Sequence, residues 1–227
     1  IRVDSTYVYH ICRGDRTLTP VVGATGPATV DVFIVGGGGR GEDRGGTLPN
    51  GGGAAGQVVT FLNQTTPAGS IVIEPGSGGG TLLGVPQPGE DSVFDVGGLN
   101  LTAAGGGAPV NGVGGSNASF SGGAISGPVI AGGGGAGGGG DGGDASPGVS
   151  GDGGPGVVND WEFGTNKTYG QGGGGGGRAP FADPDLICGT RSPFVNDSGN
   201  GGNAQCEIFS DGSGTKGIVI MRYLRQD

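Results

Sequence analysis

Residues 28–39 read ATVDVFIVGGGG, a strand pattern that runs directly into glycine. Within it Val30, Val32 and Ile34 alternate onto one face, while Phe33 lies on the other. Both faces become apolar towards the end of the run, which is typical of a strand covered on both sides. The stretch therefore predicts a central β-strand that continues into a segment without side chains.

Other short runs of β-branched and aromatic residues have the same character, and none shows the period of an amphipathic helix. The further predicted strands are 6–11, 17–19, 57–62, 70–74, 92–96, 99–103, 205–209 and 217–223. Gly97-Gly98 fits the primed turn of a tight hairpin between two of them. The sequence thus predicts an all-β fold, a jelly-roll-like β-sandwich.

Glycine accounts for 62 of the 227 residues, against a usual share of about 7%. Residues 122–156 break any Gly-X-Y repeat within a few positions, which excludes a collagen triple helix. The apolar residues are grouped into strand-like runs between the glycine segments, which argues against disorder. We expect these segments to form polyglycine II helices, with three residues per turn, inserted into one β-sandwich domain over residues 17–227.

The chain is acidic, with a net charge of −9 and a pI of about 4.4. Its only lysines are Lys167 and Lys216, so it has no basic patch for a phosphate backbone or an anionic membrane surface. No apolar stretch approaches the roughly 18 residues that cross a bilayer. We therefore expect neither nucleic acid nor a membrane span. Because the sequence starts at Ile1, we expect a removed leader or a fragment.

The cysteines and Asn-x-Ser/Thr sequons predict an extracellular protein at a cell or virion surface. Cys188 and Cys206 flank a loop rich in Gly, Asn and Ser, which a disulfide would stabilise by about 3 kcal/mol. Cys12 is then left over, either buried and free or bonded to another chain. The predicted glycosylation sites are Asn63, Asn100, Asn117, Asn166 and Asn196. Enrichment of Asn, Ser and Thr in loops is the alternative explanation of these sequons.

We expect no catalytic residues and no cofactor. Gly36, Gly38 and Gly41 match the dinucleotide fingerprint G-x-G-x-x-G after a strand, but no sequence able to form the required helix follows. His10, the single histidine, lies inside a strand-like run without a second base beside it. A secreted hydrolase with an unrecognised pair of carboxylates is the weaker enzymatic alternative.

We expect no metal site either. The acidic residues of the long glycine tract are predicted to lie in a solvated loop, and calcium binding is the alternative. They are Asp141, Asp144 and Asp152. Arg13-Gly14-Asp15 is an integrin-type tripeptide that a polar turn after the first strand explains equally well.

The first sixteen residues, 1–16, are the most informative for assembly. One interpretation makes them the first strand of the chain's own sandwich. The other makes them a strand donated to a neighbouring copy, which fills an open sheet edge and propagates a filament head to tail. The residues assigned to assembly under this second hypothesis are Tyr7, Val8, Tyr9, Ile11 and Cys12.

Several stretches between 17 and 224 resemble the glycine-rich domains of secreted bacterial and phage proteins. They are ATVDVFIVGGGG (28–39), GGAAGQVVTF (52–61), DSVFDVGGLNLTAAGGG (91–107) and GIVIMRY (217–223). The chain is also similar to the glycine-rich region of anaplastic lymphoma kinase-type receptors and to phage tail-fibre adhesin tips. The resemblance implies polyglycine helices packed beside β layers and an extracellular setting, and it carries over no catalytic residues.

Together these features predict a non-catalytic structural subunit of an extracellular fibre or surface appendage. Its expected partners are copies of itself, with covalent glycans attached. The alternative is a receptor-binding adhesin tip, in which loops between the polyglycine helices contact a glycan or a protein. This chain differs from simpler members of the family in three features. It has acidic inserts, an inserted loop with two cysteines over 178–209, and the sequons.

Overall fold

The structure, a computed structural model, describes residues 1–18, 29–43, 49–66, 70–126, 131–176, 198–204 and 212–225. Over these residues the chain forms β-strands and extended glycine-rich segments, and no helix. The strands are β1 (Arg2–Val3), β2 (Tyr7–Cys12), β3 (Arg16–Leu18), β4 (Thr29–Val35), β5 (Val58–Thr65), β6 (Ile71–Glu74), β7 (Thr81–Leu82), β8 (Val85–Pro86), β9 (Ser92–Val96), β10 (Leu99–Ala103), β11 (Val157–Asn159), β12 (Lys167–Tyr169) and β13 (Ile218–Leu224). The predicted all-β fold is confirmed over these residues, and the predicted strand 205–209 lies outside them.

Two antiparallel sheets contain most of the strands. The first has the order β1-β2-β13-β4-β5 and the second the order β10-β9-β6-β3. In the first sheet, Val219 of β13 pairs with Ile34 of β4 on one side and with Cys12 of β2 on the other. In the second sheet, β9 and β10 form the predicted hairpin around Gly97 and Gly98, whose φ angles of 53° and 95° suit a primed turn.

The first sheet is covered on both faces. One face shares an apolar core with the second sheet, in which Ile34 of β4 and Phe94 of β9 are fully buried. The other face packs against the β11–β12 hairpin. There Phe33 contacts Trp161 and Tyr169, at ring-centroid distances of 6.1 and 5.1 Å. β4 is therefore buried on both sides, as its sequence predicts.

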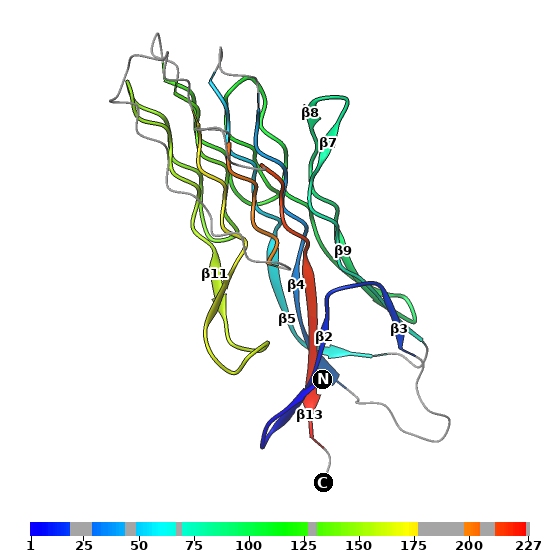
Figure 1. The fold of residues 1–227 in the computed structure, drawn as a ribbon. Coiled ribbons are helices and arrows are strands. Elements are labelled where there is room, and N and C mark those ends of the chain that lie inside the picture. Colours follow the sequence, from blue (N-terminus) through cyan, green and yellow to red (C-terminus); the bar gives the residue numbers. More distant parts are fainter. Residues whose placement is uncertain are drawn as a thin grey trace.

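The glycine-rich segments run away from the sheets side by side and give the molecule its elongated shape (Figure 1). In segment 36–42 successive N–H groups donate in three directions, and each direction recurs at every third residue. The donor–acceptor pairs are Gly36–Gln57, Gly39–Ala54 and Glu42–Gly51 in one direction, Gly37–Glu90 and Arg40–Gln87 in the second, and Gly38–Thr215 and Gly41–Gly212 in the third. This repeat differs from that of a β-strand, whose successive groups alternate between two sides.

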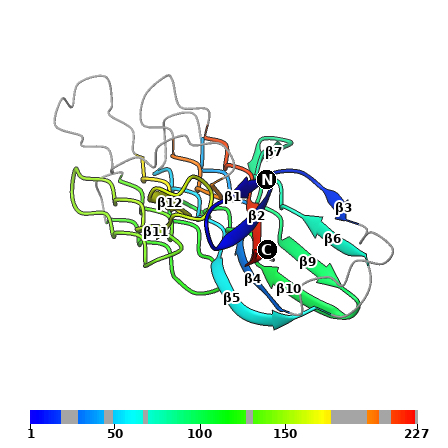
Figure 2. The same cartoon turned by 90° about the horizontal axis from the view of Figure 1, so that it is seen from below.

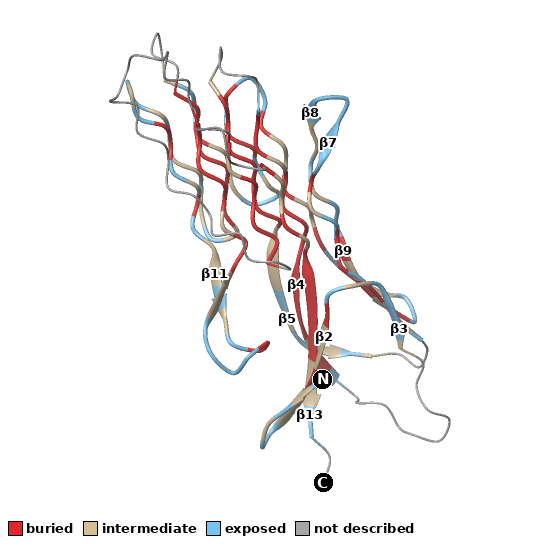
Figure 3. Cartoon of the chain, viewed as in Figure 1, coloured by how far each residue is buried: buried red, intermediate tan, exposed pale blue. Residues whose placement is uncertain are grey.

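Backbone hydrogen bonds join the segments into three rows, which we call the glycine array. The middle row consists of 76–80, 36–42, 50–57, 131–137 and 140–146. The two outer rows consist of 87–91, 104–109, 113–117 and 121–126 on one side and of 212–217, 198–204, 170–176 and 149–156 on the other. Segments 36–42, 50–57 and 131–137 are therefore enclosed by other segments and almost entirely buried (Figure 3).

Only glycine fits at most positions inside the array. A Cβ on Gly38 would lie 1.9 Å from the carbonyl oxygen of Asn200, and a Cβ on Gly133 would lie 1.9 Å from that of Gly123. Both obstructing atoms belong to buried residues and accept hydrogen bonds from other segments, Asn200 from Thr215 and Gly123 from Gly114, so neither can move away cheaply. The high glycine content is thus a packing requirement of the array.

Candidate assembly site

The N-terminal strand β2 lies in the first sheet between β13 and the two-residue β1 (Figure 2). It pairs with β13 over its whole length, from Cys12 opposite Val219 to Tyr7 opposite Leu224. On its other side it pairs with β1 only through Val8 and Tyr9. Within a single copy these residues therefore complete the chain's own sheet, and their exchange between copies stays a prediction.

The residues predicted for assembly divide between the two faces of β2. Tyr7, Tyr9 and Ile11 belong to the apolar cluster beneath the β11–β12 hairpin. Cys12 is buried in the core between the sheets as a free thiol, and burial raises its pKa. Val8 is partly buried. Removing β2 would therefore uncover both apolar clusters and the edge of β13.

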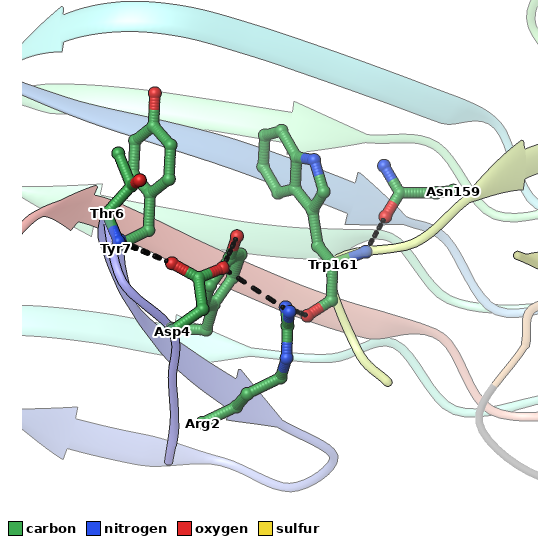
Figure 4. A network of polar contacts seen from close by, with 7 residues as sticks. Arg2, Asp4, Thr6, Tyr7, Asn159 and Trp161 are labelled. Atoms are coloured by element: carbon green, nitrogen blue, oxygen red, sulfur yellow. Dashed lines mark hydrogen bonds and ion pairs between the residues drawn. The ribbon is translucent and has the colours of Figure 1, made fainter. Parts of the chain in front are cut away.

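Asp4 fixes the turn that leads into β2 (Figure 4). Its Oδ1 accepts the N–H groups of Tyr7 at 2.7 Å and Thr6 at 2.8 Å, and its Oδ2 accepts the Tyr9 hydroxyl at 2.8 Å. The hydrogen bonds from the backbone of Tyr7 and then of Thr6 are the main cause that lowers the pKa of Asp4 from 3.8 to about 2. The turn is therefore held by an ionised carboxylate at neutral pH.

Two arginines tie the N-terminal residues to the segment between β11 and β12. Arg2 donates Nη1 to the carbonyl oxygen of Trp161 at 3.0 Å (Figure 4). Its guanidinium also lies 4.3 Å from the centre of the Tyr9 ring. Arg13, just beyond the other end of β2, forms an ion pair with Glu162. Both ends of β2 are therefore attached to the same hairpin.

Glu162 is a buried carboxylate that receives three donors. Lys167 Nζ lies 2.8 Å and the Tyr169 hydroxyl 2.5 Å from its Oε2, and Arg13 donates to its Oε1. Burial raises the pKa of Glu162, but the hydrogen bonds from these three side chains outweigh burial and hold the pKa below its usual value. Burial, and then the hydrogen bond to Glu162, raises the pKa of Tyr169. This cluster was not predicted, and the signal that marks it is the glycine-poor stretch 157–169.

The end of the array farthest from the sheets includes exposed residues (Figure 3), and several of them are apolar. The β7–β8 hairpin projects there, with Leu82, Leu83 and Val85 exposed by 62%, 96% and 58%. Leu83 has a φ of 49°, in the left-handed region that a bulky side chain disfavours. The turns at the same end add Val110, Val113, Ile125 and Val149.

Aspartates at the rim of the array replace missing backbone acceptors. Oδ1 of Asp141 accepts the N–H of Ser121 at 2.8 Å, while the N–H of Gly142 donates to the Ser121 carbonyl oxygen. Oδ1 of Asp144 accepts the N–H of Ala124 at 2.7 Å in the same way. Both residues are exposed, as expected, and a neighbouring segment supplies each carboxylate with a backbone donor.

Residues 200–204 repeat this arrangement on another side of the array. Asn200 and Asn203 accept the N–H groups of Gln171 and Gly174 through Oδ1, at 3.0 and 3.1 Å. The residue after each asparagine donates back to the same partner. The two stretches read DGGDA (141–145) and NGGNA (200–204), so their shared spacing was the sequence signal for this role.

The predicted glycosylation sites have different surroundings. Asn63 on β5, Asn100 on β10 and Asn166 between β11 and β12 are exposed. The side-chain nitrogen of Asn117 instead donates to two backbone carbonyl oxygens, at 3.3 and 3.0 Å, and a glycan there would break both hydrogen bonds. The predicted residues Asn196, Cys188 and Cys206 lie outside the described part of the chain.

The G-x-G-x-x-G stretch and His10 both make contacts within the fold. Gly36, Gly38 and Gly41 of the G-x-G-x-x-G stretch donate their N–H groups to other segments of the array. His10 stacks on Tyr223, with ring centroids 5.7 Å apart. Among the described residues, no three His, Cys, Asp or Glu side chains gather as a metal site would require, and no helix is suited to crossing a membrane.

These observations define a class: an all-β protein in which two antiparallel sheets carry a hydrogen-bonded glycine array. The chain matches the glycine-rich domain family over residues 16–224, and it belongs to that family. No curated protein matches it. The predicted resemblance to glycine-rich domains is thus confirmed, whereas the secreted bacterial or phage setting stays a prediction.

Proposed function

We propose that this protein is a non-catalytic structural subunit of an extracellular fibre or surface appendage, and that its partners are copies of itself. The proposal depends on where the exposed apolar side chains lie. Most of them gather at the two opposite ends of an elongated molecule. Each end thus offers an apolar surface to another copy.

The two ends carry different residues. The sheet end bears Ile1 and Val3 at the N-terminus, Leu62 on β5 and Leu224 at the end of β13, which are 54–83% exposed. The array end bears the β7–β8 hairpin and its neighbouring turns (Figure 1). Contacts between unlike ends are heterologous, and heterologous contacts that do not close produce an open filament. The chain is therefore suited to head-to-tail assembly.

We further propose that the two sheets form a jelly-roll-like sandwich and that the glycine segments are polyglycine II helices inserted into it. The three-residue recurrence of donors along 36–42 supports this, because an extended helix with three residues per turn points its N–H groups in three directions. Each hydrogen bond is worth about 1 kcal/mol. The array then acts as a stiff spacer along the fibre.

An extracellular location at a cell or virion surface is part of the proposal. The exposed sequons at Asn63, Asn100 and Asn166 support it, since glycans there would meet no packed neighbour. All three lie in the sheet half of the molecule. Glycans at these sites would leave the apolar array end uncovered and available for contact.

A receptor-binding adhesin tip is the second candidate. The β7–β8 hairpin favours it, because the hairpin presents Leu82, Leu83 and Val85 together around its two-residue turn, beside the far end of the array (Figure 1). Exposed apolar patches of this kind mark sites of protein interaction. In this case the protein binds a cell-surface partner through its array end and does not polymerise.

Electron microscopy of the purified protein distinguishes the two candidates. The fibre proposal predicts filaments of the wild-type chain that are lost when Leu82, Leu83 and Val85 are all replaced by serine. Val158→Ser is the matched control, because Val158 is 56% exposed on β11, away from both ends, and this variant should assemble normally. A wild-type chain that stays monomeric and binds cells through the hairpin would favour the adhesin and exclude the fibre.

A further inference from the structure

We propose that residues 1–13 are exchanged between copies, so that the N-terminal segment of one copy lies beside β13 and beneath the β11–β12 hairpin of a second copy. This inference rests on the proposed fibre function and names the partner of the assembly site. The acceptor is the position that β2 occupies in the single chain. The ligand is the same segment of a second molecule.

The contacts of β2 are of a kind that another copy can reproduce. Its ladder runs to β13, from Cys12 opposite Val219 to Tyr7 opposite Leu224. Its two charged anchors, Arg2 to the Trp161 carbonyl oxygen and Arg13 to Glu162, both end on the β11–β12 hairpin. The Asp4 turn is internal to the segment and would travel with it.

A short connection separates this segment from the rest of the chain. β2 ends at Cys12 in the first sheet, and β3 begins at Arg16 in the second. Between them stands Gly14, whose missing Cβ would meet no atom within 4 Å. Gly14 and Asp15, the two residues between the exchanged segment and β3, are therefore not held by side-chain packing. Two extended residues span about 7 Å, so the acceptor copy must lie directly beside the donor.

Exchange of the N-terminal segment also explains how a row of copies can keep growing at its ends. A copy that gives up β2 exposes the edge of β13 and both apolar clusters, and only another N-terminal segment restores them. Each copy then donates to one neighbour and accepts from another, so an open series always ends in one empty acceptor and one free segment, to which further copies can add. Glu162 and the Trp161 carbonyl oxygen select this segment, because it carries arginines at both ends of the strand.

Mixed disulfides between two full-length variants test the exchange. Tyr7 and Leu224 are opposite each other in the β2–β13 ladder, a separation that a disulfide can bridge. Tyr7→Cys and Leu224→Cys are prepared separately, mixed under assembly conditions and oxidised. We expect a dimer of the two variants on a non-reducing gel. The double variant on one chain shows that the pair can react, and Thr102→Cys, exposed on β10, replaces Leu224→Cys as the negative control.

The outcomes separate this proposal from the fibre proposal. Filaments that form from the two variants without the mixed disulfide would overturn exchange and leave the fibre intact. A wild-type chain that forms no filaments would overturn the fibre itself. As a second measurement, Arg13→Ala should lower the yield of mixed disulfide roughly tenfold, since it removes a charge-assisted hydrogen bond. Arg16→Ala, on exposed β3, should leave the yield unchanged.

Discussion

The guanidinium of Arg222 lies 3.8 Å from the centre of the Trp161 ring. The same guanidinium lies 4.4 Å from the centre of the Tyr7 ring, and its Nε donates to Oδ2 of Asp31 at 3.0 Å. These partners belong to β2, to β4 and to the hairpin segment between β11 and β12. One side chain of β13 therefore joins three elements on the outer face of the first sheet.

Arg222→Met should loosen the β11–β12 hairpin. The substitution keeps an apolar stem but removes the cation–π contacts and the ion pair, so we expect a loss of about 2 kcal/mol in the free energy of unfolding. Trp161 is the only tryptophan, and its emission should shift to longer wavelength. Arg16→Met on exposed β3 is the control. Unchanged emission and stability would show that Arg222 does not hold the hairpin.

Acid should destabilise the N-terminal segment and its attachment to the β11–β12 hairpin. The folded-state pKa values of Asp4 and Glu162 both lie below their usual values, that of Asp4 at about 2. The stabilisation from Asp4 is therefore present above the unfolded-chain pKa of about 4 and is lost as the pH falls towards 2, and the stabilisation from Glu162 declines as the pH falls below the ordinary pKa of a glutamate. Denaturant unfolding at successive pH values, followed by Trp161 emission, measures this loss.

Single variants check the assignment of the acid response. Asp4→Asn and Glu162→Gln should each flatten the decline of stability in acid, because each removes one of the titrating carboxylates. Glu74→Gln, which removes an exposed carboxylate of β6, should retain the wild-type decline. A decline that is the same in all three variants would place its origin elsewhere.

Gly133→Ala should disrupt the middle row of the array. The new Cβ would lie 1.9 Å from the carbonyl oxygen of Gly123, and the obstruction is backbone, so we expect a loss of about 3 kcal/mol or more. Gly80→Ala is the matched control, since its Cβ meets no atom within 4 Å and should change stability by less than about 0.5 kcal/mol. Thermal unfolding of both variants measures the difference. Equal effects would mean that the array is looser than its hydrogen bonds imply.

Asp144 should tolerate asparagine but not leucine. Asparagine keeps the oxygen that accepts the Ala124 N–H, whereas leucine leaves this donor to water at a cost of about 1 kcal/mol. Hydrogen exchange of the Ala124 amide should then become roughly fivefold faster in Asp144→Leu. If Asp144→Asn exchanges as fast as Asp144→Leu, the role of Asp144 depends on its charge and not on its acceptor.

The local pattern of apolar residues correctly predicted two kinds of strand: those buried on both faces and those joined by a tight turn. The strand predicted at 28–35, where the run 28–39 is apolar, agrees with β4 to within one residue, and Gly97-Gly98 correctly predicted the turn of the β9–β10 hairpin. The β11–β12 hairpin was not predicted, because its strands have three residues each and form by packing Trp161 on Phe33, far away in the chain. Whether such a short segment forms a strand depends more on its tertiary packing than on its own residues.

The structure around the candidate assembly site was predicted in part. The alternation around Tyr7 and Tyr9 predicted a strand, but the chain's own β13 as its partner is a contact between opposite ends of the sequence. The glycine-poor stretch 157–169 marks the region, but the role of Glu162 could not be predicted, because its donors Arg13 and Lys167 come together only when the sheet and the hairpin are both formed. A single buried carboxylate produces no repeating pattern in the sequence from which its burial could be predicted.

The glycine array has a consequence for how stability varies with temperature. Unfolding apolar cores raises the heat capacity, whereas exposing peptide groups lowers it. The buried segments of the array consist mainly of peptide groups, so the heat-capacity increment per residue should fall below the usual 12–15 cal/mol/K, as calorimetry can measure. The stability curve is then broad and shallow, and cooling should weaken this protein far less than one whose interior is mostly hydrocarbon.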